Sequence, residues 1–162
     1  MKKEVRKFLE GECRYIFCYG SLRPDDDSGM PWTKDAVEGL TAQPAKILGA
    51  KLYRDQYAAL VFDGQNEKDD RNAVIGWVLT TENPTLFREK LATFDEIEQY
   101  EEDGTGFYQR AIVDVRLMDP ERTIGSTEPI GSSGSFVSAY VYHRPDCSKE
   151  QRIVTGDWLK RE

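Results

Sequence analysis

Short apolar runs separated by turn residues dominate the chain, and their β-branched and aromatic residues predict β-strands. Six segments have this pattern: 15–19, 45–53, 58–62, 73–80, 111–117 and 136–143. The polar break at 54–56 predicts a hairpin or close bend between the second and third segments. Gly76 lies inside the fourth segment and predicts a bulge or the close approach of another backbone. In the fifth segment, apolar residues at the odd positions give the period-2 pattern of a half-buried strand.

One segment favours a helix. Asn83 followed by Pro84 is a start signal, because asparagine caps free amides and proline suits the first helical position. The helix is predicted from Pro84 to about Glu98. The fold class is therefore α+β: a small mixed β-barrel of five to six strands, or a strongly curled sheet, with helices on its outside.

The polar segments 23–31 and 125–135 predict surface loops, and the second is rich in glycine and serine, as expected for a mobile insertion. No internal repeat or linker interrupts the 162 residues. A single domain over residues 1–162 is expected, since domains commonly have about 100–200 residues.

The charge balance narrows the choice of partner. Twenty-two basic against 29 acidic residues give a net charge of −7. An acidic chain without a basic patch argues against binding to nucleic acid or to an anionic membrane. No stretch approaches the roughly 20 apolar residues of a membrane span, and the first twelve residues lack an apolar signal core. A cytoplasmic protein is expected.

Cysteine and histidine are few. Cys13, Cys18 and Cys147 are odd in number and lack CxxC spacing, which favours a reducing compartment over disulfides or a zinc site. His143 is the single histidine, so it has no histidine partner for a metal site. We expect these residues to be packing or surface residues.

Glu98 is the most informative position in the predicted helix. At about 100° per residue it falls within roughly 40° of Phe87, Leu91 and Phe94, in the middle of the apolar stripe. A carboxylate on a core-facing stripe is costly unless it is paired or lines a cavity. Two interpretations stay open: the helix frays and Glu98 turns to water, or Glu98 projects into a pocket as a general acid or base.

A second candidate site follows the first predicted strand. In Tyr19-Gly20-Ser21-Leu22 the glycine permits a sharp turn, so that successive N–H groups point outward as an anion-binding nest. An ordinary strand-ending turn explains the same residues. The run is not a P-loop, because no Gly-Lys-Ser/Thr follows it.

Together, the run 19–23 and the helix end Phe94-Asp95-Glu96-Ile97-Glu98 resemble the gamma-glutamylcyclotransferase-like superfamily, with its YG(S/T)L loop and LDxFEG-type helix end. Four further segments fit in the same order: 52–62 to the YPAL strand, 107–110 to the YxR strand entry, 139–142 to AxVY and 155–158 to sGdW. The resemblance covers roughly residues 15–160. This chain departs from the family pattern at four positions, where proline, leucine, phenylalanine and glycine are replaced by Ala58, Phe94, Ile97 and Gln99, respectively. The segment 23–40 is also longer than the minimal loop of the family.

The resemblance implies intramolecular aminolysis of a small γ-glutamyl amine or amino acid, which gives 5-oxoproline and a free amine. It implies that Glu98 is the catalytic base and acid. The backbone amides of Gly20, Ser21 and Leu22 would hold the substrate, and Tyr19 and Tyr108 would line the cavity or simply pack in the barrel. It implies no cofactor and no metal, because the nucleophile belongs to the substrate, and we expect a monomer or homodimer.

Two other functions stay open. Gln99 and the acidic loop also fit a non-enzymatic small-ligand-binding module on the same barrel. A third hypothesis is cleavage of a γ-glutamyl linkage in another metabolite class, such as an ε-lysine isopeptide.

Overall fold

A computed structural model of the chain describes residues 8, 10–25, 31–54, 57–62, 72–144 and 151–160. The predicted loop 23–31 is thus described only at its two ends. Cys147 and residues 55–56 of the predicted hairpin lie outside the described residues.

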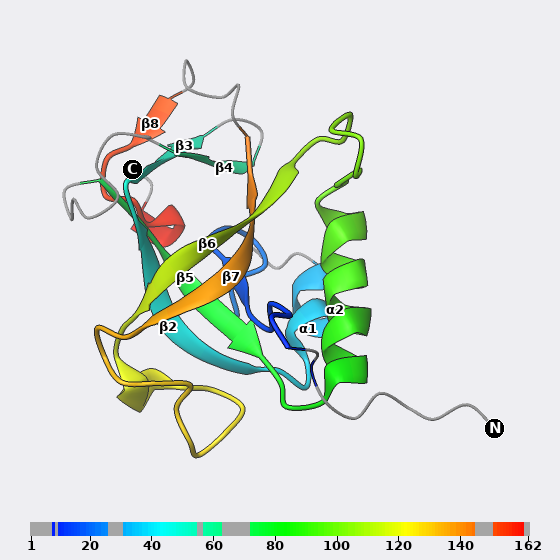
Figure 1. Ribbon diagram of the computed structural model, residues 1–162. Helices are drawn as coiled ribbons and strands as arrows, with labels where there is room; N and C mark the ends of the chain where they lie inside the picture. Colours follow the sequence, from blue (N-terminus) through cyan, green and yellow to red (C-terminus); the bar gives the residue numbers. More distant parts are fainter. Residues whose placement is uncertain are drawn as a thin grey trace.

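The centre of the fold is a closed barrel of five strands in the order β1-β5-β2-β6-β7 (Figure 1). These strands are β1 (Ile16–Cys18), β2 (Thr41–Leu48), β5 (Ala73–Thr80), β6 (Gln109–Leu117) and β7 (Phe136–His143). Neighbouring strands are antiparallel except β1 and β7, whose parallel pairing closes the barrel. The predicted mixed barrel is confirmed.

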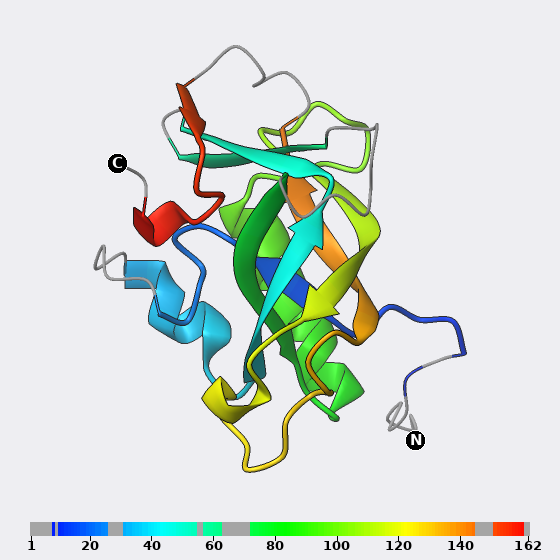
Figure 2. The same cartoon turned by 90° about the vertical axis from the view of Figure 1, so that its left-hand side faces the viewer.

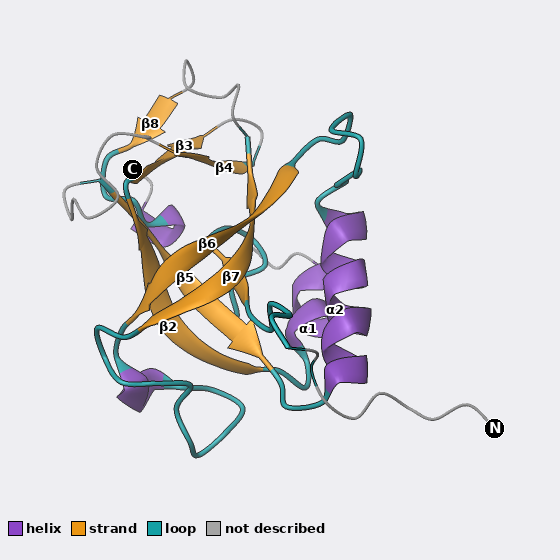
Figure 3. Ribbon diagram, in the orientation of Figure 1, coloured by secondary structure: helices purple, strands orange, loops and turns teal. Residues whose placement is uncertain are grey.

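A second sheet lies over one end of the barrel (Figure 3). It has the order β4-β3-β8, formed by β3 (Ala50–Arg54), β4 (Ala58–Phe62) and β8 (Gln151–Ile153). The predicted single strand over 45–53 was wrong, because the chain leaves the barrel at Gly49, whose φ of 72° is readily adopted only by glycine. The predicted hairpin between 53 and 58 is confirmed as the β3–β4 pair.

Helix α2 (Pro84–Ile97) packs against the outside of the barrel, with the shorter α1 (Pro31–Val37) in contact with it (Figures 1 and 2). Asn83 caps α2 as predicted, since its side chain accepts a hydrogen bond of 3.2 Å from the Leu86 N–H. Helix α1 begins at Pro31, where the sequence predicts the end of a surface loop. Two 3₁₀ turns, Pro120–Arg122 and Trp158–Lys160, complete the described elements.

Alternation along β1 divides the core in two. Phe17 faces the barrel interior, whereas Ile16 and Cys18 face the layer under the helices, together with Phe87 and Phe94 of α2. Gly76 of β5 is the predicted close approach: a Cβ there would collide with the Cys18 carbonyl oxygen and the Phe17 ring. The β1–β5 contact therefore requires glycine at position 76.

The glycine-rich loop 125–135 is held to the barrel, which the prediction of a mobile insertion did not anticipate. Gln43 of β2 is fully buried, and its side-chain amide donates to the carbonyl oxygens of Met118 and Gly131 at 3.0 and 2.9 Å. Its oxygen accepts from the Gly131 N–H at 3.1 Å. The buried Gln43 amide thus provides hydrogen-bond partners for backbone groups of the loop that would otherwise have none.

Candidate active site

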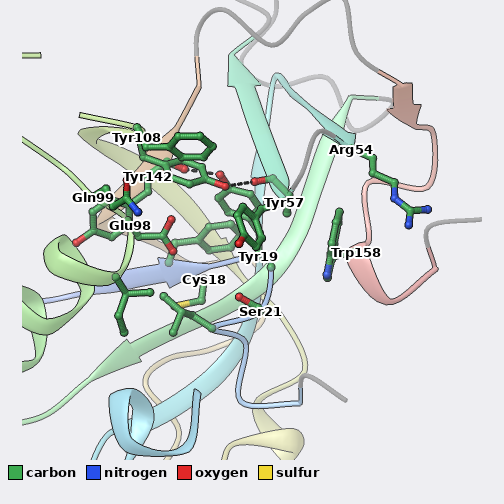
Figure 4. Close-up of a pocket in the computed structure, with 16 residues that line it drawn as sticks. Cys18, Tyr19, Ser21, Arg54, Tyr57, Glu98, Gln99, Tyr108, Tyr142 and Trp158 are labelled. Atoms are coloured by element: carbon green, nitrogen blue, oxygen red, sulfur yellow. Dashed lines mark hydrogen bonds between the residues drawn. The ribbon is translucent and has the colours of Figure 1, made fainter. Parts of the chain in front are cut away.

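A cavity of about 620 Å³ opens where β1, α2 and the second sheet meet (Figure 4). Its volume lies in the range of small-molecule sites, about 300–1,000 Å³. Its walls are mainly apolar and aromatic. The lining residues are Phe17, Cys18, Tyr19, Gly20, Ser21, Leu22, Arg54, Tyr57, Ala58, Ile97, Glu98, Gln99, Phe107, Tyr108, Tyr142 and Trp158.

Glu98 reaches this cavity from the end of α2. The residue is the C-cap of the helix, and its N–H donates to the Phe94 carbonyl at 2.8 Å, so the helix does not fray before it. Its carboxylate points into the cavity, which favours the second of the two interpretations that the sequence left open (Figure 4). Burial raises the pKa of Glu98 to about 8. The group can therefore take up and release a proton near neutral pH.

The next residue sets the direction in which the chain leaves α2. Gln99 has a φ of 53°, in the left-handed region that glycine prefers. The N–H of Phe107 donates to the Gln99 carbonyl at 2.8 Å, which closes the loop after the helix. Glutamine therefore keeps a backbone conformation that a glycine would adopt freely, at a steric cost of roughly 1 kcal/mol.

The segment 19–22 forms the cavity wall beside Glu98. Its turn is closed by a 3.0 Å hydrogen bond from the Arg23 N–H to the Gly20 carbonyl. No hydrogen bond joins the N–H groups of Gly20, Ser21 or Leu22 to other described residues, so these donors are available to a ligand. Gly20 is not in the left-handed region, so the turn does not depend on the conformational freedom of glycine. It is needed for space, since a Cβ would lie 2.9 Å from that of Ala58.

The two predicted tyrosines line the cavity and also bind backbone. The Tyr19 hydroxyl donates to the Tyr142 carbonyl at 2.5 Å and accepts from the Leu60 N–H at 3.1 Å. The Tyr108 hydroxyl donates to the Ala58 carbonyl at 2.5 Å. Both interpretations of these residues are thus correct: they pack in the fold, and they form the pocket wall.

An acid–base cluster behind Glu98 was missed by sequence reasoning. Asp95 of α2 accepts from Arg110 at 2.6 Å and from the Tyr142 hydroxyl at 2.5 Å. Burial and the neighbouring Asp95 carboxylate raise the pKa of Tyr142, which stays protonated. Asp95 lies at the edge of the apolar stripe, and this was the signal that could have found it.

A second missed cluster holds the segment 19–22 in place. Arg23 is only 3% exposed and forms ion pairs with Asp25 at 2.8 Å and Asp157 at 2.7 Å. Burial opposes ionisation of Asp25, but the Arg23 guanidinium outweighs it and lowers the pKa of that carboxyl group. Arg23 therefore ties the cavity wall to the segment 155–158.

Cysteine and histidine lie where packing residues are expected. Cys18 is buried in the cavity wall, and burial, with the negative charge of Glu98 as a smaller cause, raises its pKa well above the ordinary value. His143 does not line the cavity; its ring contacts Phe62 with centroids 4.9 Å apart, and burial lowers its pKa. Within the described ranges, no three His, Cys, Asp or Glu side chains are grouped to hold a metal ion. None of the described helices has the length and apolar character to cross a membrane.

The protein is thus a closed barrel with a cavity of small-molecule size, lined by one carboxylate and by three backbone amides that have no partner among the described residues. The chain belongs to the gamma-glutamyl cyclotransferase, AIG2-like family, whose model matches residues 16–160. The resemblance stated from the motifs is confirmed. No match is found among curated proteins.

Three solved structures share the fold. An uncharacterised protein, PH0828, from Pyrococcus horikoshii has a TM-score of 0.53 and 19% identity, covering 90% of this chain and 89% of that chain. YkqA from Bacillus subtilis has a TM-score of 0.52 and 19% identity over 90% of this chain, but only 39% of YkqA is covered. At3g28950.1 from Arabidopsis thaliana has a TM-score of 0.50 and 20% identity, covering 84% and 64% of the two chains.

Proposed function

We propose that the protein is a cyclotransferase that converts a small γ-glutamyl amine or amino acid into 5-oxoproline and a free amine, without a cofactor. The substrate's own α-amine attacks its γ-carbonyl carbon, and the bond from that carbon to the leaving nitrogen breaks. The α-ammonium loses two protons in all, and the leaving amine gains two. No protein nucleophile is required.

Glu98 is the proposed proton carrier. The α-ammonium cannot attack until it loses a proton, and Glu98 takes that proton and later delivers one to the leaving nitrogen. The observation that supports this role is a carboxylate in an apolar cavity with a pKa raised to about 8, beside the donors of segment 20–22. A substrate ammonium next to Glu98 would favour its ionised form and so create the base when substrate binds.

The N–H groups of Gly20, Ser21 and Leu22 are the proposed oxygen-binding donors. They would hold a carboxylate or the γ-carbonyl oxygen of the substrate and keep it folded back on itself. In a reaction within one molecule, this conformational restriction supplies much of the rate.

The test is release of 5-oxoproline from a panel of γ-glutamyl compounds. Glu98→Gln should remain folded by circular dichroism and lose roughly 10²–10⁴ in kcat. Glu96→Gln, which removes a carboxylate from the exposed face of the same helix, is the matched control. Equal turnover by wild type and Glu98→Gln would contradict the role of Glu98.

The alternative of a binding module without turnover was motivated by Gln99. Its left-handed φ of 53° keeps the turn that a glycine would make, so this replacement alone gives no reason to exclude catalysis. Calorimetric binding of γ-glutamyl compounds with no 5-oxoproline from any of them would favour the module. Mass spectrometry of the products separates cyclisation from cleavage of another γ-glutamyl linkage.

A further inference from the structure

Arg54 lies at the opposite side of the cavity from Glu98, next to Trp158 (Figure 4). Among the described residues that line the cavity, Glu98 is the one carboxylic acid and Arg54 the one basic residue. The cavity thus has an acidic end beside the segment 19–22 and a basic end at its mouth. A ligand that spans it should be cationic where it meets Glu98 and anionic where it meets Arg54.

The position of Arg54 in its strand is unusual. Residues 50, 52 and 54 of β3 share one face, and Ala50 and Leu52 on that face are fully buried in the core. Arg54 pairs in register with Ala58, whose carbonyl accepts from Tyr108 in the cavity wall. The arginine therefore stands where the alternation calls for an apolar residue, at the point where the core gives way to the cavity.

The Arg54 guanidinium has no interaction partner in the described part of the chain. The side chain is exposed and makes no ion pair or hydrogen bond with a described residue. Asp157, the neighbour of Trp158 in the chain, is paired with Arg23 and so does not compete with an anionic ligand for Arg54. An exposed arginine at a cavity mouth is suited to bidentate binding of a carboxylate.

Aromatic residues line the same cavity as Arg54. Trp158 is one of them, and Tyr57 and Phe107, which are 41% and 37% exposed, contact each other edge to face with centroids 6.4 Å apart. These rings give an apolar surface for the side chain of a leaving group. The mouth thus combines a cation with an apolar wall.

We infer that Arg54 determines specificity by binding a carboxylate on the leaving amine, so that the protein prefers γ-glutamyl amino acids or peptides with an apolar side chain over γ-glutamyl derivatives of simple amines. This inference rests on the proposed function for the identity of the ligand. It assigns Arg54 a part in substrate choice and none in the proton transfers.

A matched pair of compounds tests it: γ-glutamylphenylalanine and the γ-glutamyl amide of 2-phenylethylamine, which differ by one carboxylate. For wild type, kcat/KM for the carboxylated compound should exceed that for the other by about tenfold, the effect of one charge-assisted hydrogen bond in a partly exposed site. Arg54→Gln should reduce this ratio to about one, and Arg54→Lys should keep part of it. Arg152→Gln, which removes an equal charge from a side chain bonded to Asn72 outside the cavity, should keep the wild-type ratio.

Binding of both compounds to Glu98→Gln protein, with and without Arg54→Gln, gives a second readout that does not need turnover. A tenfold difference in Kd that Arg54→Gln removes supports the inference even if neither compound yields 5-oxoproline, which would contradict the proposed function alone. Turnover of both compounds at equal kcat/KM would overturn the role of Arg54 and leave the proposed function in place. An unchanged ratio in Arg54→Gln would overturn it as well.

Discussion

Arg23 and Glu98 are two ionisable residues that both lie close enough to Cys18 to influence its pKa, and their surroundings differ completely. Arg23 has two carboxylate partners within 2.8 Å. Glu98 makes no ion pair or side-chain hydrogen bond with the described residues, and burial raises its pKa to about 8. Removing one member of a buried, fully paired cluster leaves its partners uncompensated and destabilises the fold, whereas a buried ionisable group without partners is available for chemistry.

The largest expected effect on stability is at Arg23. Arg23→Met leaves Asp25 and Asp157 without their common partner and should lower the free energy of unfolding by about 3 kcal/mol, measured by urea denaturation. Arg122→Met is the control, because Arg122 forms an exposed pair with Asp119 at 3.6 Å and lies 5.3 Å from the Trp77 ring centroid, two contacts each worth about 1 kcal/mol or less. Equal losses in the two variants would show that Arg23 is no more important than a surface charge.

The pH dependence of stability should single out Glu98. The ordinary pKa of the Glu98 carboxyl group is 4.5, and its pKa in the folded protein is about 8. At pH values between these two, the folded chain holds a proton that the unfolded chain has lost. The folded state then binds more protons, so stability is greatest at low pH and falls as pH rises through this window. From pH 6 to 8 wild type should lose roughly 2 kcal/mol relative to Glu98→Gln.

Urea denaturation of both proteins at each half pH unit measures this difference. Glu96→Gln on the exposed face of α2 is the matched control. Parallel curves for wild type and Glu98→Gln would mean that Glu98 has no raised pKa in the folded protein.

Asp95 sharpens the comparison, because it lies on the same helix as Glu98 but has partners like those of Arg23. Tyr142→Phe removes one of its two donors and leaves Arg110 in place. The loss in stability should be about 1 kcal/mol, with kcat for 5-oxoproline release changed by less than tenfold. A hundredfold fall in kcat at unchanged stability would instead place the Tyr142 hydroxyl at the reacting atoms.

The smallest effect is expected at Gln99. Gln99→Gly removes the steric cost of a φ of 53° but adds conformational entropy to the unfolded chain. The two contributions should leave a net gain of roughly 0.5 kcal/mol, visible as a higher Tm. A lower Tm would mean that the glutamine side chain contributes contacts that outweigh its backbone strain.

The sequence predicts those features that depend on the periodicity of a single helix or strand. The alternation over 111–117 identifies β6, and the angular position of Glu98 places it on the apolar stripe, because both follow from the geometry of one element. Whether its side chain turns to water or enters a cavity depends on the other elements around it. The change of sheet at Gly49 was missed because the residues on both sides are apolar. Helix α1 was missed although Pro31 suits its first position, because it has only seven residues and directly follows a polar segment.

The pattern of hydrophobic and polar residues could not predict contacts between segments that are distant in the sequence. Arg23 and Asp157 lie 134 residues apart, and Arg110 and Asp95 lie 15 apart on different elements. Nothing in the spacing of single charges shows which pairs meet. For the same reason, the sequence indicates only an ordinary turn residue at Arg54. Its place in the cavity lining becomes visible only in the folded structure.

The hydrogen bond from the Leu60 N–H to the Tyr19 hydroxyl gives the protein a spectroscopic reporter. This amide proton belongs to the second sheet, but its acceptor is a phenol in the cavity wall. Its resonance and its rate of exchange with solvent therefore depend on whether Tyr19 stays in place. A ligand that displaces or fixes that ring should be detectable at a single backbone amide, before any product is formed.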